Sequence, residues 1–293
     1  MNVTIDHRPG AAGGVTAAPP APRKPIDWAR IGSYIVLLVL TVIYLGPLLM
    51  LLNTSLLTPN EFNKSPMTLP SGLRLDNFFE AWDKANFARY LLNSILYTVI
   101  ATTVFVVTGT FLAVAIARRF VRGSGLMFTL FLIAVFLPPA LIPQFQLILR
   151  MGLFNNPLGY VMLFVVNPIG IIILVSYIRT IPIELDEAAA IEGAGYLRYV
   201  LQIIMPLAKP AVATVAVLHA IGIWNELILP TIYLTSSDYY PITRGLIAFQ
   251  GVYGNNWPLL ASAVLMIALP MVVFFVFMQR YIIGGVTAGA VKG

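Results

Sequence analysis

Four acidic side chains stand within nine residues of a chain that is 59% hydrophobic: Glu184, Asp186, Glu187 and Glu192. A carboxylate at the centre of a membrane span costs roughly 2.5–3.5 kcal/mol, so four would cost about 10–14 kcal/mol. This segment must therefore lie outside any hydrocarbon layer. Small and apolar residues between the acids leave room for another protein to approach closely, which predicts a docking surface.

The order of residues over 181–210 predicts a helix, a turn and a second helix. Pro182 suits a first helical turn, and the acids that follow it are favoured near a helix N-terminus. Gly193 and Gly195 are expected to end this helix with positive φ. The second helix is expected from about residue 196 to 204, stopping before Pro206.

One further acid lies within an apolar segment. Glu226 follows Trp224 and Asn225 near the outer end of that segment. An ionisable residue inside a span is a candidate for contact with substrate, because its burial is costly. Aromatic residues are also common at membrane interfaces. The sequence leaves both roles open.

Aromatic and amide side chains are frequent in the segment that follows, over 233–257. Tyr253, Asn255 and Trp257 are its candidate contact residues. Flat aromatic faces and amide groups suit sugars. Ordinary solvation of an exposed loop explains the same residues equally well.

The sequence contains no phosphate-binding loop, because the dipeptide Gly-Lys does not occur in it. Its two histidines, His7 and His219, are far apart, and it has no cysteine. No metal site or disulfide is therefore expected. His219 lies inside an apolar segment and is expected to contact neighbouring helices.

Composition indicates the class of protein that must position these residues. Of 293 residues 10% are charged, against roughly 25% in an average soluble domain. A soluble globule needs a more polar surface, so a cytosolic enzyme and a nucleic-acid-binding protein are excluded. An integral membrane protein remains.

Six apolar segments reach the roughly 20 residues that cross about 30 Å of hydrocarbon. They are about 31–52, 90–117, 124–149, 157–178, 210–229 and 258–279. The first lacks a cleavage pattern of small residues, so it is interpreted as a span and not as a signal peptide. The sequence thus predicts an all-α membrane protein with six transmembrane helices. Residues 1–27 are rich in Ala, Gly and Pro and predict a disordered cytoplasmic tail.

Basic residues set the orientation. With the N-terminus inside, the inner segments hold twelve basic residues, and the outer segments hold six that are balanced by six acids. Arg118, Arg119 and Arg122 form a short inner loop without an acid. This bias places both termini in the cytoplasm.

Prolines recur within the apolar segments, most densely at Pro138, Pro139 and Pro143. Interior proline kinks a helix, and kinked helices that line a path suit a transporter. Proline is also commoner in membrane helices in general. Both interpretations stay open.

The acidic segment resembles the EAA signature of bacterial ABC importer permeases. In that signature Glu-Ala-Ala is followed by Gly, and further on by Ile and Leu-Pro. The matching residues are Glu187, Ala188, Ala189, Gly193, Ile203, Met205 and Pro206, with methionine in place of the usual leucine. Stretches at 152–159, 224–226 and 279–293 are similar to the carbohydrate branch, in particular to the smaller membrane subunit of maltose-type sugar transporters.

The resemblance implies a type I ABC importer permease fold in a bacterial cytoplasmic (inner) membrane. It implies a permease domain over 28–293 with a core of about 88–282, and a coupling loop at 181–210 that docks into the ATPase. The chain is then not an enzyme and binds no cofactor, since ATP and Mg belong to partner subunits.

The implied partners are a second permease, giving a heterodimer, two ATP-binding subunits, an extracytoplasmic sugar-binding protein and the lipid bilayer, but no nucleic acid. In relatives the C-terminal tail, here Val291, Lys292 and Gly293, reaches the ATPase dimer. The external loop before the last span helps to release sugar from the binding protein.

Other functions are open at this point. An ABC permease for a non-sugar solute would carry the same acidic segment. An ion-coupled secondary transporter would usually hold ionisable residues deep in the membrane, where this chain has almost none. No catalytic cluster supports a membrane-embedded enzyme.

Overall fold

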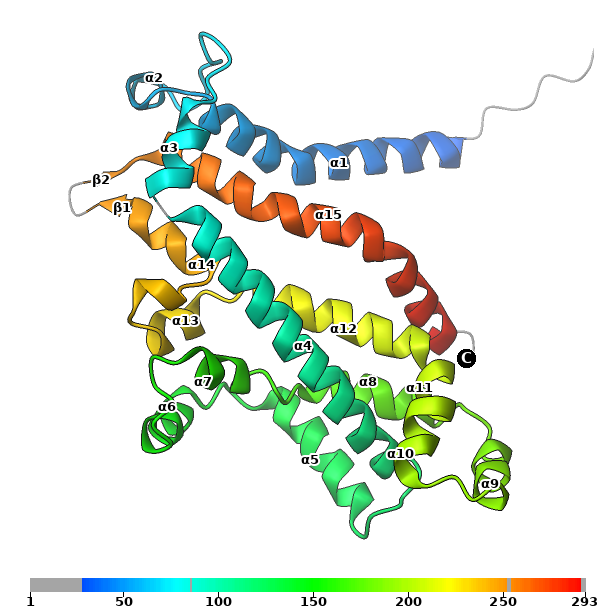
Figure 1. Cartoon of the computed structure of the whole chain (residues 1–293). Coiled ribbons are helices and arrows are strands. Elements are labelled where there is room, and N and C mark those ends of the chain that lie inside the picture. The colour runs from blue at the N-terminus through cyan, green and yellow to red at the C-terminus, as the bar shows by residue number, and fades with distance from the viewer. Residues whose placement is uncertain (1–27, 85, 252–253, 291–293) are drawn as a thin grey trace, which may run out of the picture. The chain divides into compact units, whose positions relative to one another are not determined.

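The computed structural model describes residues 28–84, 86–251 and 254–290. The chain divides into two compact units, 1–47 and 48–293, and each is treated by itself. Apart from one short hairpin, the regular structure of the described residues is helical, as the sequence predicts (Figure 1). The expected tail at 1–27 lies outside the described residues.

Three helices are long and apolar enough to cross a membrane as single elements. They are α1 (Trp28–Ser55), α4 (Phe87–Ala117) and α15 (Trp257–Ala290). Counting each strongly bent helix pair as one span gives up to five spans among the described residues. The other three apolar segments are each interrupted, so six transmembrane helices remain a prediction.

Adjacent prolines interrupt the segment at 124–149. Helices α5 (Ser124–Phe136) and α6 (Leu141–Arg150) meet at 113°. Pro138 and Pro139 lie between them, and Leu137 is extended with ψ 142°. Proline disfavours the helical conformation in the residue before it, so two adjacent prolines favour a sharp turn at this point.

An asparagine precedes each of the two helices that make up the segment at 157–178. Helix α7 (Pro157–Met162) begins after Asn156, and α8 (Pro168–Ile178) begins after Asn167. Each asparagine Oδ1 accepts a hydrogen bond from a backbone N–H of the first turn, at 2.8 Å and 3.0 Å respectively. Each proline stands at the first helical position, where its missing N–H is not needed.

The second helix of the acidic segment does not stop before Pro206. It runs through α10 (Tyr196–Arg198), the π-helix η1 (Tyr199–Ile204) and α11 (Met205–Leu207). A proline ring crowds the carbonyl four residues earlier, and the wider π-turn just before Pro206 relieves that crowding. The chain then turns by 85° into α12 (Lys209–Trp224).

Short elements gather around the N-terminal end of α4 (Figure 1). They are α2 (Pro59–Lys64), α3 (Asp76–Lys84), α13 (Ile228–Tyr233), η2 (Ser237–Tyr239), α14 (Ile242–Gly245), η3 (Leu246–Phe249), β1 (Gln250–Gly251) and β2 (Gly254–Asn255). The two strands pair antiparallel, with Gln250 opposite Asn255. Thr58 and Glu61 form a capping box at the start of α2. Hydrogen bonds from Ser71 and Thr58 to the Glu61 carboxylate lower its pKa to about 2.

Helix α4 is central to the packing of residues 48–293. Its Phe105 is fully buried in a core with residues of α8 and α12, and Ser94 Oγ accepts a hydrogen bond from Ile242 N at 2.8 Å. Helix α8 approaches closely because Gly170 has no side chain: a Cβ there would stand 2.5 Å from the Phe105 ring. This packing fixes α4 and α12 as the frame for the sites described below.

Gly159→Ala is expected to destabilise the protein. A Cβ at this position would lie 2.1 Å from the backbone oxygen of Leu153, which is held by the turn before α7. Overpacking of this kind costs typically about 1–3 kcal/mol. A lower melting temperature in detergent is the measurement. Gly222→Ala in α12 is the control, because nothing lies within 4 Å of its added Cβ. Equal melting of both variants would contradict the prediction.

Candidate functional site

The elbow, residues 181–210, begins with α9 (Glu184–Ile191), whose first turn holds Glu184, Asp186 and Glu187. Its end has the geometry of a Schellman motif, with Gly193 N donating to Ala190 O at 3.1 Å and Ala194 N to Ala189 O at 3.0 Å.

Gly193 has φ +71°, which confirms the prediction of positive φ for that glycine. The prediction is wrong for Gly195, whose φ is −66° and ψ 161° as it begins α10. One left-handed residue is enough to reverse the chain here, so the second glycine is free to be extended.

A buried ion pair fixes the elbow to the end of α4. Arg118 Nε lies 2.8 Å from Asp186 Oδ2, and the two side chains are only 6% and 15% exposed. Tyr199 Oη donates to Asp186 Oδ1 at 2.6 Å, and the Arg118 guanidinium donates to Ile181 O at 3.0 Å. These contacts link three parts of the elbow to one arginine. Burial makes such a pair depend on both partners, because either charge alone would be uncompensated.

Aromatic side chains complete this attachment. Tyr196 Oη donates to Phe111 O of α4 at 2.7 Å. The ring of Phe120 meets the rings of Tyr196 and Tyr199, each at 6.0 Å between centroids. These rings and α9 enclose a hollow of about 300 Å³.

The EAA residues divide between this hollow and the outside. Ala189 is buried, whereas Glu187, Ala188 and Gly193 are exposed. Ile203 and Met205 are partly buried and Pro206 is exposed. Exposed apolar side chains flank the motif, among them Ile191 at 87%. The elbow therefore has one face fixed to α4 and one apolar, acidic face free for a partner.

Sequence reasoning missed the role of Arg118. Its charge indicated only the orientation of the chain. Its partner Asp186 lies far along the sequence, beyond two further apolar segments. The position of Arg118 directly after α4 was the available signal, because a long side chain at the end of that helix reaches the elbow.

At the C-terminal end of α12, Trp224 is 6% exposed and its Nε1 donates to Ile267 O at 3.4 Å. Glu226 Oε1 accepts hydrogen bonds from Ile228 N and Leu229 N at 2.8 Å and 3.1 Å, so this carboxylate caps α13. Asn225 is exposed and lines a hollow of about 520 Å³ between α12 and α15. Of the three side chains, that of Asn225 is the exposed one, and its Nδ2 donates to Ile221 O at 2.9 Å.

Trp257, another predicted contact residue, lies against α2. Trp257 is 47% exposed and stacks on Phe62 at 6.4 Å between centroids. Asn255 contributes its backbone to β2, whereas Tyr253 lies outside the described residues. Val291, Lys292 and Gly293 also lie outside them.

His219 bridges the break between α7 and α8, which confirms its expected role as a helix-contact residue. Its Nε2 lies 3.0 Å from Phe164 O, and its Nδ1 lies 2.9 Å from Asn167 Nδ2. The carbonyl can only accept, so Nε2 carries the proton and Nδ1 accepts from the amide. The described part of the chain contains no group of three or more His, Cys, Asp or Glu side chains that could hold a metal.

Comparison with known proteins identifies this arrangement. Residues 86–286 match the family model described as a binding-protein-dependent transport system inner membrane component. The chain belongs to this family. Members are non-catalytic membrane subunits of ABC transporters and work in complexes with other subunits, so this permease is a multi-pass membrane protein.

Curated relatives cover most of the permease. It is 31% identical over 266 residues to the diacetylchitobiose uptake system permease protein of Streptomyces coelicolor, covering 89% of this chain and 88% of that one. It is 32% identical over 258 residues to the melibiose/raffinose/stachyose import permease protein of Bacillus subtilis, covering 84% and 91%. It is also 32% identical over 284 residues to the osmoprotective compounds uptake permease protein of Synechocystis, covering 92% and 95%.

A solved structure shares the fold of this permease. It is the crystal structure of a bacterial ABC transporter involved in the import of the acidic polysaccharide alginate, with a TM-score of 0.79 at 20% identity. The match covers 90% of this chain and 99% of that one. The ABC importer permease fold expected from the sequence is thereby confirmed.

Arg118→Met is expected to loosen the elbow. Removing one partner of a buried pair costs roughly 3–5 kcal/mol, because the other charge stays buried without compensation. We expect faster hydrogen exchange of the α9 amides in the purified permease. Arg122→Met, an exposed arginine of the same loop, is the control. Unchanged exchange in Arg118→Met would show that the ion pair does not hold α9.

Proposed function

We propose that this chain is the membrane-spanning permease subunit of an ATP-driven, binding-protein-dependent sugar importer in the bacterial inner membrane. It crosses the membrane six times, with both termini in the cytoplasm, and forms the translocation path with a second permease. An external binding protein delivers the sugar. Two ATP-binding subunits hold ATP and Mg and drive the change of state, and this chain binds neither.

The observation that carries this proposal is the attachment of the elbow to α4. The free face of α9 offers exposed apolar side chains and small residues to an ATPase subunit. The opposite face is fixed to α4 through Arg118 and Asp186. Movement of the elbow by a partner is therefore passed to α4, and through the shared core to α8 and α12. A nucleotide-driven change between two states of the path follows.

A sugar as the transported solute is supported by the relatives named for diacetylchitobiose and for melibiose, raffinose and stachyose. The relative named for osmoprotective compounds favours a compatible solute as the second candidate. Ion-coupled transport has less support, because Glu226 caps α13 at the outer end of α12. Residues 291–293 are proposed to contact the ATPase subunits.

Uptake by the reconstituted transporter tests the proposed function. The full complex with its binding protein is given labelled diacetylchitobiose, melibiose, raffinose and stachyose, and separately a compatible solute. ATP-dependent accumulation of at least one sugar is expected. Accumulation of the compatible solute alone would show that the transported solute is not a sugar. Accumulation without ATP would contradict ATP-driven transport.

Gly193→Val is expected to leave membrane insertion intact but to uncouple ATP hydrolysis from transport. A β-branched residue resists the φ of +71° that closes the Schellman motif, so α9 loses its orientation. Gly195→Val is a matched control, because its extended backbone suits valine and no atom lies within 4 Å of its Cβ. Transport per ATP should fall at least about tenfold in the first variant only. Normal coupling in Gly193→Val would count against the docking role.

Deletion of residues 184–206 is expected to abolish co-purification of the ATPase with the solubilised permease. This segment contains the exposed apolar face of the elbow, and the rest of the permease offers no comparable match to the EAA signature. Binding measured after affinity capture of the permease is the readout. Full capture of the ATPase by the deletion variant would place its docking surface elsewhere.

A further inference from the structure

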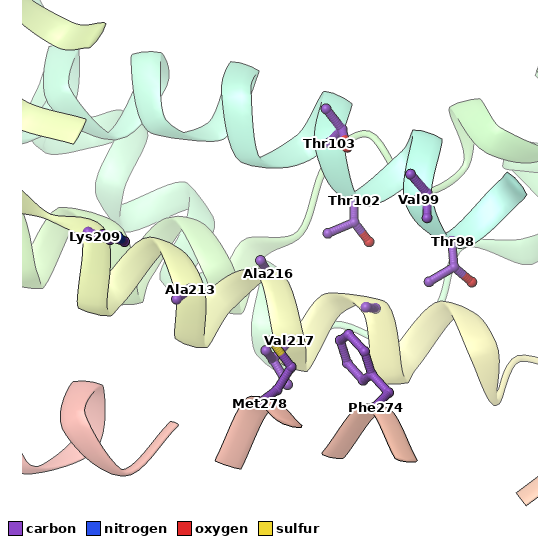
Figure 2. A pocket seen from close by; sticks show the side chains of 11 residues that line it. Thr98, Val99, Thr102, Thr103, Lys209, Ala213, Ala216, Val217, Phe274 and Met278 are labelled. Atoms are coloured by element: carbon purple, nitrogen blue, oxygen red, sulfur yellow. The ribbon is translucent and has the colours of Figure 1, made fainter. Parts of the chain in front are cut away.

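A groove follows α12 between α4 and α15 (Figure 2). One cavity of about 450 Å³ is lined by residues of all three helices, including Lys209 at the start of α12. A second cavity of about 230 Å³ shares Thr98, Val99, Ala220 and Phe274 with the first and reaches Trp224, the last residue of α12. The groove therefore extends over the whole of α12, from its first residue to its last.

Two threonines on the α4 wall differ from other helical threonines of this chain. Thr98 and Thr102 have buried hydroxyl oxygens with no hydrogen-bond partner among the described residues. Six other threonines donate to the carbonyl oxygen four residues earlier in their own helix: Thr41, Thr108, Thr110, Thr129, Thr214 and Thr231. Thr98 and Thr102 lack that usual bond, so their hydroxyls are available to another molecule.

The two hydroxyls lie on one face of α4, because residues four apart are neighbours on a helix. Figure 2 shows both side chains pointing from α4 toward α12. A buried hydroxyl without a partner is uncommon in native proteins and calls for a ligand, a water molecule or another state of the protein. Both oxygens are buried in this structure, so a ligand reaches them only in a state in which α12 stands further from α4.

Apart from Thr103 and Lys209, the rest of the lining is apolar and mostly small. Alanines of α12 form its floor, among them Ala213, Ala216 and Ala220, and Phe274 of α15 stands opposite α4. A smooth apolar wall with two hydroxyls and aromatic rings matches the chemistry of a sugar, which offers C–H faces to rings and hydroxyls to hydroxyls. A lipid chain or an apolar partner helix would leave both threonine hydroxyls unpaired.

We propose that Thr98 and Thr102 bind hydroxyl groups of the transported sugar as it passes along the groove of α12. This inference rests on the proposed function and adds to it the residues of this chain that contact the solute. Few and weak contacts suit a path, because the solute must leave as easily as it enters. Lys209, which belongs to both the elbow and α12, marks one end of the groove.

Thr98→Val and Thr102→Val remove the hydroxyls and keep the side-chain volume. We expect each to lower sugar uptake per ATP hydrolysed about threefold to tenfold, and the double variant to lower it further. Raffinose and diacetylchitobiose are the probes, in the reconstituted complex. Thr108→Val is the matched control on the same helix, because its hydroxyl donates to carbonyl oxygens of α4 itself, Val104 O at 2.8 Å and Phe105 O at 3.4 Å. Uptake equal to that of the control in both variants would overturn the inference.

A second measurement does not depend on uptake. The natural chain has no cysteine, so Thr98→Cys and Thr102→Cys each introduce a single thiol. We expect a charged, membrane-impermeant methanethiosulfonate to modify this chain in the nucleotide-free or the ATP-trapped complex, and raffinose or diacetylchitobiose to slow the modification. Thr110→Cys, at a fully buried position, is the unreactive control.

The outcomes separate this site from the proposed function. Thiols that are unreactive in both nucleotide states would mean that lipid or a partner helix fills the groove, and the inference would fail. If neither sugar slows the modification in a complex that transports both, the groove is a water-filled crevice that the sugar does not enter, and the inference would fail. A wild-type complex that transports neither sugar contradicts the proposed function instead, and the reactivity of the thiols still shows whether the groove is open.

Discussion

A backbone N–H or C=O inside hydrocarbon has no water to bind, so each must find its partner within the protein. This constraint decides where the permease can interrupt its helices. The break between α7 and α8 is possible because Asn167 receives a backbone N–H of α8 and His219 lies against the carbonyl oxygen of Phe164. The same two side chains also bond to each other, so the break is held from two helices at once. Removing one polar group therefore leaves another without a partner.

The elbow follows a related rule at the membrane edge. Charged groups there are stable only when they are paired or exposed to water, and the elbow contains charged groups of both kinds. Asp186 turns inward to Arg118 and Tyr199, while the neighbouring Glu184 and Glu187 remain exposed. The buried pair gives the elbow a fixed attachment, and the exposed face stays free for a partner. The attachment and the docking face thus come from adjacent residues of one short helix.

Much of the fold could be predicted from sequence because apolar length and loop charge are local properties. The EAA residues were found from their resemblance to a family signature, and the positive φ of Gly193 from its place at the end of a predicted helix. The interruptions could be predicted only in part: proline marks them, but whether a helix bends or continues depends on neighbours, as the π-helix before Pro206 shows. The roles of Arg118, Thr98 and Thr102 depend on contacts between helices far apart in the chain. Glu226 illustrates the same limit, since its use as a cap on α13 follows from a turn that composition does not reveal.

Helices α5 and α8 pack against each other and contain 13 and 11 residues. At 1.5 Å per residue they are about 20 Å and 16 Å long, well short of the roughly 30 Å of hydrocarbon. Neither helix crosses such a layer alone, so the bend before α6 and the break before α8 fall within the length that a span requires. A channel-facing wall made of such half-length helices presents backbone groups at its interruptions, where a continuous helix would present side chains alone.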